Sequence, residues 1–154
     1  MFPLELIALL AHHLATAVVI TEPDLDFPGP TIRYVNPAFL ALTGYQASEL
    51  LGASPRLLHG PETSRTALAE LVRALRDVGS FHGVLANYRR GGERYLCEIR
   101  AFRIDDDNGR PANYVAFERE VVRRRGRPRA GTLGRYKPVL AQTQDELVDL
   151  FAKI

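Results

Sequence analysis

Three strand-forming segments follow one another between residues 81 and 122, and they constrain the fold more than any other feature. FHGVLANYRR (81–90), RYLCEIRAFRI (94–104) and ANYVAFEREVV (112–122) are rich in β-branched and aromatic residues. Gly91 and Gly92 separate the first two segments, and DDDNGRP separates the second from the third. Both connections are typical of turns, so we predict two successive hairpins that place three strands side by side.

Two shorter strands and several helices precede these hairpins. AVVITE (17–22) and TIRYV (31–35) are predicted strands, and the proline-dense segment PDLDFPGP between them is a predicted loop. Short helices follow over 36–42 and 47–52, and a longer helix, capped by Thr63 or Ser64, ends at Gly79. This order predicts an α+β fold, in which a five-stranded antiparallel sheet carries short helices on one face.

Each end of the chain is predicted to form a further helix. Residues 3–13 are apolar on nearly every side, so this helix must be covered by its own domain or by a second copy. Thr143 and Glu146 have capping-box spacing at the start of an amphipathic C-terminal helix. We therefore divide the chain into an N-terminal helix (1–16), a main domain (17–122), a basic Gly/Arg linker (123–138) and a C-terminal helix (139–154).

The composition narrows the possible classes of function. Cys97 is the only cysteine, which excludes an internal disulfide and fits a reducing compartment. The apolar opening segment has no basic residue before it and is too short to span a bilayer, so we predict a cytoplasmic protein without membrane association. No histidine pair has metal-ligand spacing, and no nucleophile with a base is recognisable. We therefore predict neither a metal site nor an enzyme.

Several motifs in order resemble the PAS family of sensory domains. TIRYVNPAFLALTGYQASELLG (31–52) is similar to the PAS signature, and GASPRLLHGPET (52–63) with FHGVLANYRRGGERY (81–95) resembles the light-oxygen-voltage (LOV) branch of that family. The resemblance covers about residues 17 to 120. It implies the PAS fold and a pocket for flavin mononucleotide (FMN) between the sheet and the helices.

The loop that begins at Gly52 departs from the LOV pattern at the photoactive position. In that family the loop reads G-x-N-C-R-F-L-Q, and light joins the cysteine sulfur to the flavin ring. Here Pro55 stands at the place of that cysteine. Proline has neither a nucleophile nor a backbone donor, so the resemblance implies a cysteine-less LOV domain in which no cysteinyl adduct forms at this position.

The resemblance also implies which residues line the pocket. Asn87 keeps a family asparagine, whereas Cys97 replaces an asparagine and Glu118 replaces a glutamine. An ionised glutamate only accepts hydrogen bonds, and each unsatisfied buried group costs about 1–3 kcal/mol. We expect no bound cofactor, with FMN binding as the alternative. The implied lining residues are Val19, Thr21, Ser54, Arg56, His59, Asn87, Cys97, Ile99 and Glu118.

For three of these side chains, a structural role is an alternative to ligand binding or redox chemistry. Arg56 either binds an anion or caps backbone carbonyls and forms salt bridges. His59 is interpreted as a pocket-lining or surface residue rather than a ligand. Cys97 is interpreted as a small buried hydrophobic residue rather than a redox thiol.

The segment RRRGRPR (123–129) is similar to an AT-hook, a short motif that lies in the minor groove of A·T-rich DNA. Its candidate DNA contacts are Arg125, Arg127 and Arg129, although a basic linker gives the same pattern. Our main interpretation is a non-enzymatic sensory or protein-interaction module that acts through homodimerisation and a signalling protein partner. The alternative is a DNA-associated accessory protein.

Overall fold

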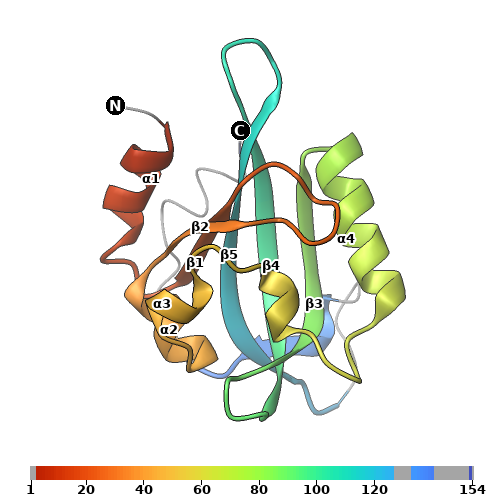
Figure 1. Cartoon of the computed structure of the whole chain (residues 1–154). Coiled ribbons are helices and arrows are strands. Elements are labelled where there is room, and N and C mark those ends of the chain that lie inside the picture. Colours follow the sequence, from red (N-terminus) through yellow and green to blue (C-terminus); the bar gives the residue numbers. More distant parts are fainter. Residues whose placement is uncertain (1–2, 127–132, 141–152, 154) are drawn as a thin grey trace.

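The computed structural model describes residues 3–126, 133–140 and 153 (Figure 1). An antiparallel sheet runs through the molecule in the strand order β2-β1-β5-β4-β3, and α-helices pack around it. This confirms the predicted α+β class and the five strands of the PAS fold. The strands are β1 (Ala17–Thr21), β2 (Ile32–Val35), β3 (Ser80–Tyr88), β4 (Arg94–Asp105) and β5 (Pro111–Arg123).

The strand register decides which side chains share a face of the sheet. Ala116 on β5 lies opposite Val19 on β1 and Ala101 on β4, and these three side chains face the helices. Phe117 lies opposite Val18 and Arg100, and its row faces the other way because successive residues of a strand alternate between faces. We call these the inner face and the outer face of the sheet.

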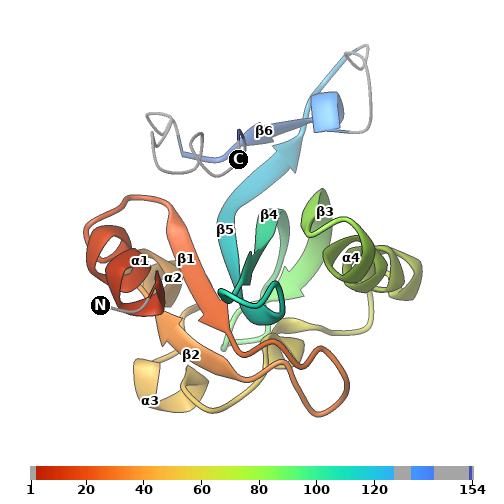
Figure 2. The ribbon, with the colours of Figure 1, turned by 90° about the horizontal axis from the view of Figure 1, so that it is seen from above.

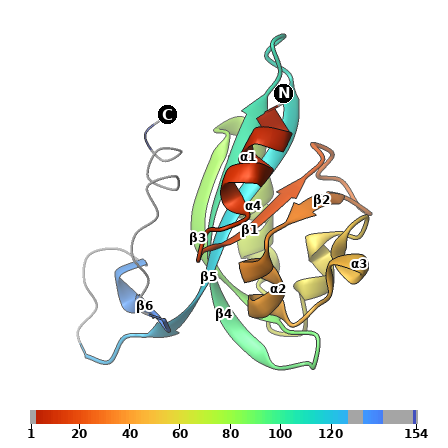
Figure 3. The ribbon, with the colours of Figure 1, turned by 90° about the vertical axis from the view of Figure 1, so that its left-hand side faces the viewer.

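The helices that follow β2 in the chain lie on the side of the inner face (Figures 2 and 3). The longest of them, α4, begins where the Ser64 hydroxyl accepts a hydrogen bond from the Ala67 amide at 3.1 Å. It ends at Asp77, and Gly79, whose φ of +89° suits glycine, follows just after the C-cap residue Val78. The helices are α2 (Pro37–Thr43), α3 (Ala47–Leu50), the 3₁₀ turn η1 (Pro55–Leu58) and α4 (Arg65–Asp77).

Asn36, fully buried ahead of α2, ties three segments together. Its amide oxygen accepts from the backbone of Val18 at 2.8 Å and of Phe39 at 3.0 Å, so it caps α2 and also holds β1. Its amide nitrogen donates to the carbonyls of Ala11 and Thr16, both at 2.9 Å. The approach of the N-terminal segment to the sheet is therefore fixed by one side chain.

The N-terminal helix α1 (Pro3–Ala11) packs on the outer face at the β1 end of the sheet. Ile7 and Ala11 are buried there against Val18, Ile20 and Phe117. The opposite side of the helix stays exposed, with exposed fractions of 48% for Leu6, 63% for Leu9 and 51% for Leu10. The domain therefore covers only one side of this apolar helix.

The segment predicted as a linker contains regular structure. A 3₁₀ turn, η2 (Leu133–Arg135), precedes a short strand, β6 (Tyr136–Pro138), which pairs antiparallel with residues 121–123 of β5. A strand of three residues is too short to show a recognisable sequence pattern. β6 forms because it pairs with β5, which already lies in the sheet. Arg125 is exposed. Arg127, Arg129 and nearly all of the predicted C-terminal helix lie outside the described residues, so the DNA-binding alternative stays a prediction.

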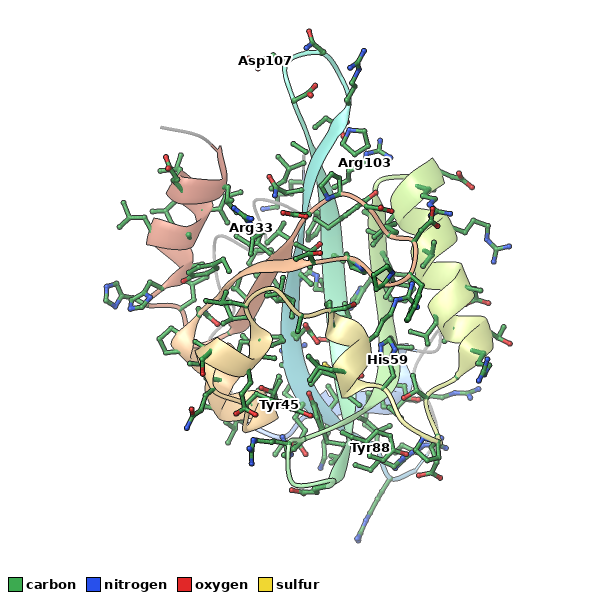
Figure 4. The ribbon with its side chains drawn as sticks, viewed as in Figure 1. Arg33, Tyr45, His59, Tyr88, Arg103 and Asp107 are labelled. Carbon is green, nitrogen blue, oxygen red and sulfur yellow. The ribbon has the colours of Figure 1, made fainter. Side chains whose placement is uncertain are left out.

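Among the described residues, none of the helices combines the length and the apolarity that crossing a bilayer requires. The acidic stretch before Gly109 forms the tip of the β4–β5 hairpin, as predicted, and Asp107 lies at that tip (Figure 4).

Candidate ligand pocket

A cavity of about 130 Å³ lies between the inner face of the sheet, η1 and α4. Its walls are mostly apolar and include Val19, Ile99 and Ala116 from the strands and Leu71 and Leu75 from α4. The fold thus brings together, around one cavity, residues that lie far apart in the sequence. Seven of the nine predicted lining residues surround it, namely Val19, Thr21, Arg56, His59, Asn87, Ile99 and Glu118.

The remaining two predicted residues lie beside the cavity rather than in its wall. The Ser54 hydroxyl accepts a hydrogen bond from the Arg56 amide at 3.2 Å and so caps η1. Cys97 is fully buried on β4, where its thiol donates to the Glu118 carboxylate at 3.2 Å. Both residues hold a lining residue in place.

The loop between β1 and β2 contributes residues that the sequence did not indicate. In Figure 1 this loop crosses in front of the sheet and reaches α4. Its Leu25 is 5% exposed and packs in one cluster with Leu75 and Tyr114. Leu25 and Pro30 both line the cavity. The loop therefore closes the cavity, although its proline-dense sequence predicts only an irregular connection.

Two arginines fix this loop. Arg56 donates from Nε to the Gly29 carbonyl at 2.6 Å and from a terminal nitrogen to the Leu25 carbonyl at 3.0 Å. Arg76 on α4 forms an ion pair with Asp26 at 2.6 Å. Of the two roles left open for Arg56, the structure shows carbonyl capping.

Pro55 is the first residue of η1 and forms part of the cavity wall. Its fixed φ suits the start of a helical turn, where no backbone donor is needed. His59 follows the turn and lies between η1 and α4 (Figure 4). Burial, and then the charge of Arg56, lower the pKa of His59 below its usual value of 6.5. The imidazole is therefore mainly neutral at neutral pH.

Glu118 is 5% exposed and, among the residues that the structure describes, is the one carboxylate in the cavity wall. Burial raises its pKa to about 7, and the hydrogen bond from Cys97 opposes that shift. Burial also raises the pKa of the Cys97 thiol, so the sulfur stays protonated and donates. With this pKa the carboxyl of Glu118 is partly protonated near neutral pH, and in its protonated form it donates a hydrogen bond as well as accepting one.

Two buried polar atoms at the cavity have no hydrogen-bond partner. Asn87 is 2% exposed and its side-chain oxygen is unpaired, and the same holds for the hydroxyl of Thr21, which is 5% exposed. Buried polar atoms without partners are uncommon in folded proteins and mark places where a ligand can supply the missing bond.

In this conformation the cavity is small for a ligand of the size of FMN. Pockets for ligands of that size measure about 300–1,000 Å³, and this one is less than half the lower limit. Asn87 and a protonated Glu118 could still meet the polar edge of a ring, so the mismatch is one of space. Leu25, held by Arg56 through its own backbone carbonyl, occupies part of the region between the sheet and α4.

The chain belongs to the PAS domain family, whose profile matches residues 16–122. Among curated proteins it is 35% identical over 105 residues to the bacterioopsin transcriptional activator of Halobacterium salinarum, which covers 68% of this chain and 16% of that protein. It is 33% identical over 98 residues to phototropin-2 of rice, which covers 64% of this chain and 11% of phototropin-2. The chain therefore corresponds to a small part of these relatives.

Solved structures of LOV domains are also similar to this chain. A light-oxygen-voltage domain studied with a flavin analogue superposes with a TM-score of 0.65 at 33% identity, covering 79% of this chain and 86% of that one. The LOV domain of a blue-light-activated histidine kinase from Erythrobacter litoralis gives a TM-score of 0.64 at 25% identity, covering 70% of this chain and 97% of that one. The PAS domain thus has LOV-type relatives.

Proposed function

We propose that this PAS domain is a non-enzymatic sensory or protein-interaction module that works without flavin photochemistry and acts as a homodimer. The observation that carries the proposal is the small cavity, which Pro55 borders and Leu25 closes. The LOV relatives include a blue-light-activated histidine kinase, and a sensory role for this chain follows from that likeness. The departure from light sensing follows from the pocket.

The absence of photochemistry rests on where the thiol lies. The sole cysteine is on β4, fully buried and bonded to Glu118, whereas the 3₁₀ turn that resembles the reactive loop carries Pro55. A buried thiol with a raised pKa is a poor nucleophile, because the thiolate is the reactive form. No light-driven bond to a ring in the cavity is expected from either residue.

The absorption spectrum of the purified protein tests this proposal. We expect no structured absorption band in the blue and no flavin in the supernatant after denaturation. A stoichiometric flavin band would contradict the proposal of a flavin-free pocket. Reversible bleaching of such a band under blue light would contradict the absence of photochemistry as well.

A further inference from the structure

The end of β5 and the short strand β6 form a two-stranded ribbon that projects from the rest of the sheet (Figures 2 and 3). Residues 136–138 of β6 pair with residues 121–123 of β5. Just beyond these pairs, the backbone amide of Arg124 donates a hydrogen bond to the carbonyl of Arg135. The ribbon carries five exposed basic residues, namely Arg123, Arg124, Arg125, Arg135 and Lys137.

The positive charge of the chain is concentrated in this region. Residues 121–144 contain seven basic residues and no acidic one, whereas the rest of the chain contains thirteen basic and eighteen acidic residues, a net charge of −5. None of the five ribbon residues forms a salt bridge with a carboxylate of the described residues. Glu120, the carboxylate that precedes the ribbon on β5, is already paired with Arg89 at 2.7 Å. The ribbon is therefore a basic surface on an otherwise acidic molecule.

Strand pairing brings like charges together on the ribbon. Arg124 and Arg135 adjoin each other across the two strands, and Lys137 follows Arg135 by two residues on the same strand. Like charges that face each other across a strand pair destabilise it. A polyanion bound across both strands removes this repulsion, and four of the five basic residues are arginines, which bind phosphate groups through two parallel hydrogen bonds.

The shape of the ribbon favours duplex DNA among the polyanions. The major groove of B-form DNA is about 12 Å wide and about 8.5 Å deep, and it admits a two-stranded β-ribbon. Three paired residues per strand rise about 10 Å, which is enough to reach the floor of this groove. Arg123 and Lys137 belong to successive pairs and so face opposite sides of the ribbon, towards the two phosphate backbones that border the groove. The major groove of duplex RNA is too narrow for this entry.

We propose that the ribbon formed by the end of β5 and by β6 binds double-stranded DNA, entering the major groove and contacting the phosphates with its basic side chains. This inference goes beyond the proposed sensory function and does not depend on it. It also differs from the AT-hook interpretation, in which an extended segment lies in the minor groove and Arg125, Arg127 and Arg129 make the contacts.

Fluorescence anisotropy with the full chain and a labelled duplex of about 20 base pairs tests this inference. We expect saturable binding with a Kd in the micromolar range, and a logarithm of the binding constant that falls linearly with the logarithm of the salt concentration. Combining Arg124→Ala, Arg135→Ala and Lys137→Ala should weaken binding at least about tenfold and should reduce the salt slope by about 2–3, because each lost phosphate contact contributes about 0.9.

A matched control removes the same amount of charge elsewhere on the surface. It replaces three exposed arginines that form no salt bridge with the described residues, namely Arg65→Ala, Arg73→Ala and Arg110→Ala. We expect this variant to bind DNA within about threefold of the wild type and to keep its salt slope.

Arg135→Glu separates phosphate binding from a structural role of the ribbon. The substitution places opposite charges side by side at Arg124 and residue 135, so it should preserve the strand pair or strengthen it. It should nevertheless weaken DNA binding more than Arg135→Ala does, because the new carboxylate repels phosphate. DNA binding that is unchanged in Arg135→Glu would contradict the inference.

Competing probes decide which groove and which polyanion are recognised. We expect A·T-rich and G·C-rich duplexes to bind within about threefold of each other, since phosphate contacts carry no sequence information, and we expect no displacement by the minor-groove ligand netropsin. A duplex RNA of the same length and vesicles that contain phosphatidylglycerol should both bind more weakly than duplex DNA.

Several results would overturn the inference. They are the absence of salt-dependent DNA binding, equal binding by the ribbon variant and its control, an A·T preference that netropsin abolishes, or tighter binding of duplex RNA or of the vesicles. Each of these leaves the proposed sensory function standing. Conversely, protein that purifies with stoichiometric flavin and still binds DNA through the ribbon would contradict the proposed function and leave this inference intact.

Discussion

At the scale of single residues, Glu118 couples the pocket to pH. Its pKa is about 7 in the folded protein and 4.5 in an exposed chain, so the folded state holds a proton that the unfolded state has released between these values. Stability therefore falls as pH rises from 4.5 to 7. Above pH 7 the buried carboxylate costs on the order of 3 kcal/mol, and below pH 4.5 this cost disappears.

Glu118→Gln should remove this cost while its amide oxygen still accepts from Cys97. We expect the variant to melt several degrees above the wild type at pH 8 and to show little difference at pH 5. Glu70→Gln, on the exposed side of α4, is the matched control and should change neither value. An equal effect of Glu118→Gln at both pH values would mean that ionisation of this residue is not responsible.

Asn36 provides the second residue-scale prediction. Asn36→Ala removes four hydrogen bonds and leaves the amide of Val18 and the carbonyl of Ala11 without this partner, so we expect a loss of about 3 kcal/mol in the free energy of unfolding. Asn36→Asp keeps both acceptor contacts and loses both donors, so its loss should be intermediate if the fold tolerates the charge. Urea unfolding measures these values against Asn108→Ala, and a loss of less than about 1 kcal/mol for Asn36→Ala would argue against the role of this side chain.

The sequence predicted more of the pocket's walls than of its chemistry. Val19 and Ile99 are apolar residues on predicted strands, and the family resemblance places them in the pocket wall. The bond between Cys97 and Glu118 could not be predicted, because it depends on how two strands are aligned and on how deeply the carboxylate is buried. The same burial raises the pKa of Glu118 to about 7, so that its carboxyl can also donate a hydrogen bond near neutral pH.

At the scale of whole elements, the role of the β1–β2 loop in closing the cavity is the feature that the sequence predicted least. Its sequence gives proline and aspartate, which indicate a surface connection, and nothing in it shows that Leu25 points inward. The contacts that hold it come from Arg56 and Arg76, at least 27 residues later in the chain than the residues that they contact. Strand β6 was missed for a similar reason, since it exists only through its pairing with the end of β5.

Leu25→Ala should enlarge the cavity and change which ligands enter it. We expect a loss of about 2–5 kcal/mol in stability, typical of removing a buried leucine side chain, and new binding of 2-quinolinone, a two-ring lactam. Phe27→Ala is the control on the same loop, because Phe27 is 82% exposed and does not line the cavity. Equal binding of 2-quinolinone to wild type and Leu25→Ala would show that the loop does not set the size of the ligand. Protein-observed NMR titration with 2-quinolinone measures binding to each protein, and urea unfolding measures the loss of stability.

At the scale of the whole molecule, the outer face is the surface on which a second copy could pack. The exposed side of α1 carries Leu6, Leu9 and Leu10, and a specific interface usually buries about 1,200–2,000 Å² in total. One helix is too small for this, so the neighbouring outer face of the sheet must contribute. Part of the charge on that face is paired within the chain, because Glu98 lies 2.6 Å from Arg119 and 3.4 Å from His82. Hydrogen bonds from His82 and then Arg119 lower the pKa of Glu98 to about 2, so this carboxyl is ionised beside Arg119 at neutral pH.

The two sides of α1 allow dimerisation to be separated from folding. Leu9→Asp combined with Leu10→Asp should produce monomers with a nearly unchanged melting temperature, since both side chains are more than half exposed in the single chain. Ile7→Asp is the contrasting variant: it places a charge against Val18 and Phe117 and should destabilise the fold itself. Light scattering at micromolar concentration measures the mass, and a wild-type value near the 17.2 kDa of one chain would contradict the homodimer. Loss of the dimer in Ile7→Asp, with the Leu9 and Leu10 variant still dimeric, would move the interface away from the exposed side of this helix.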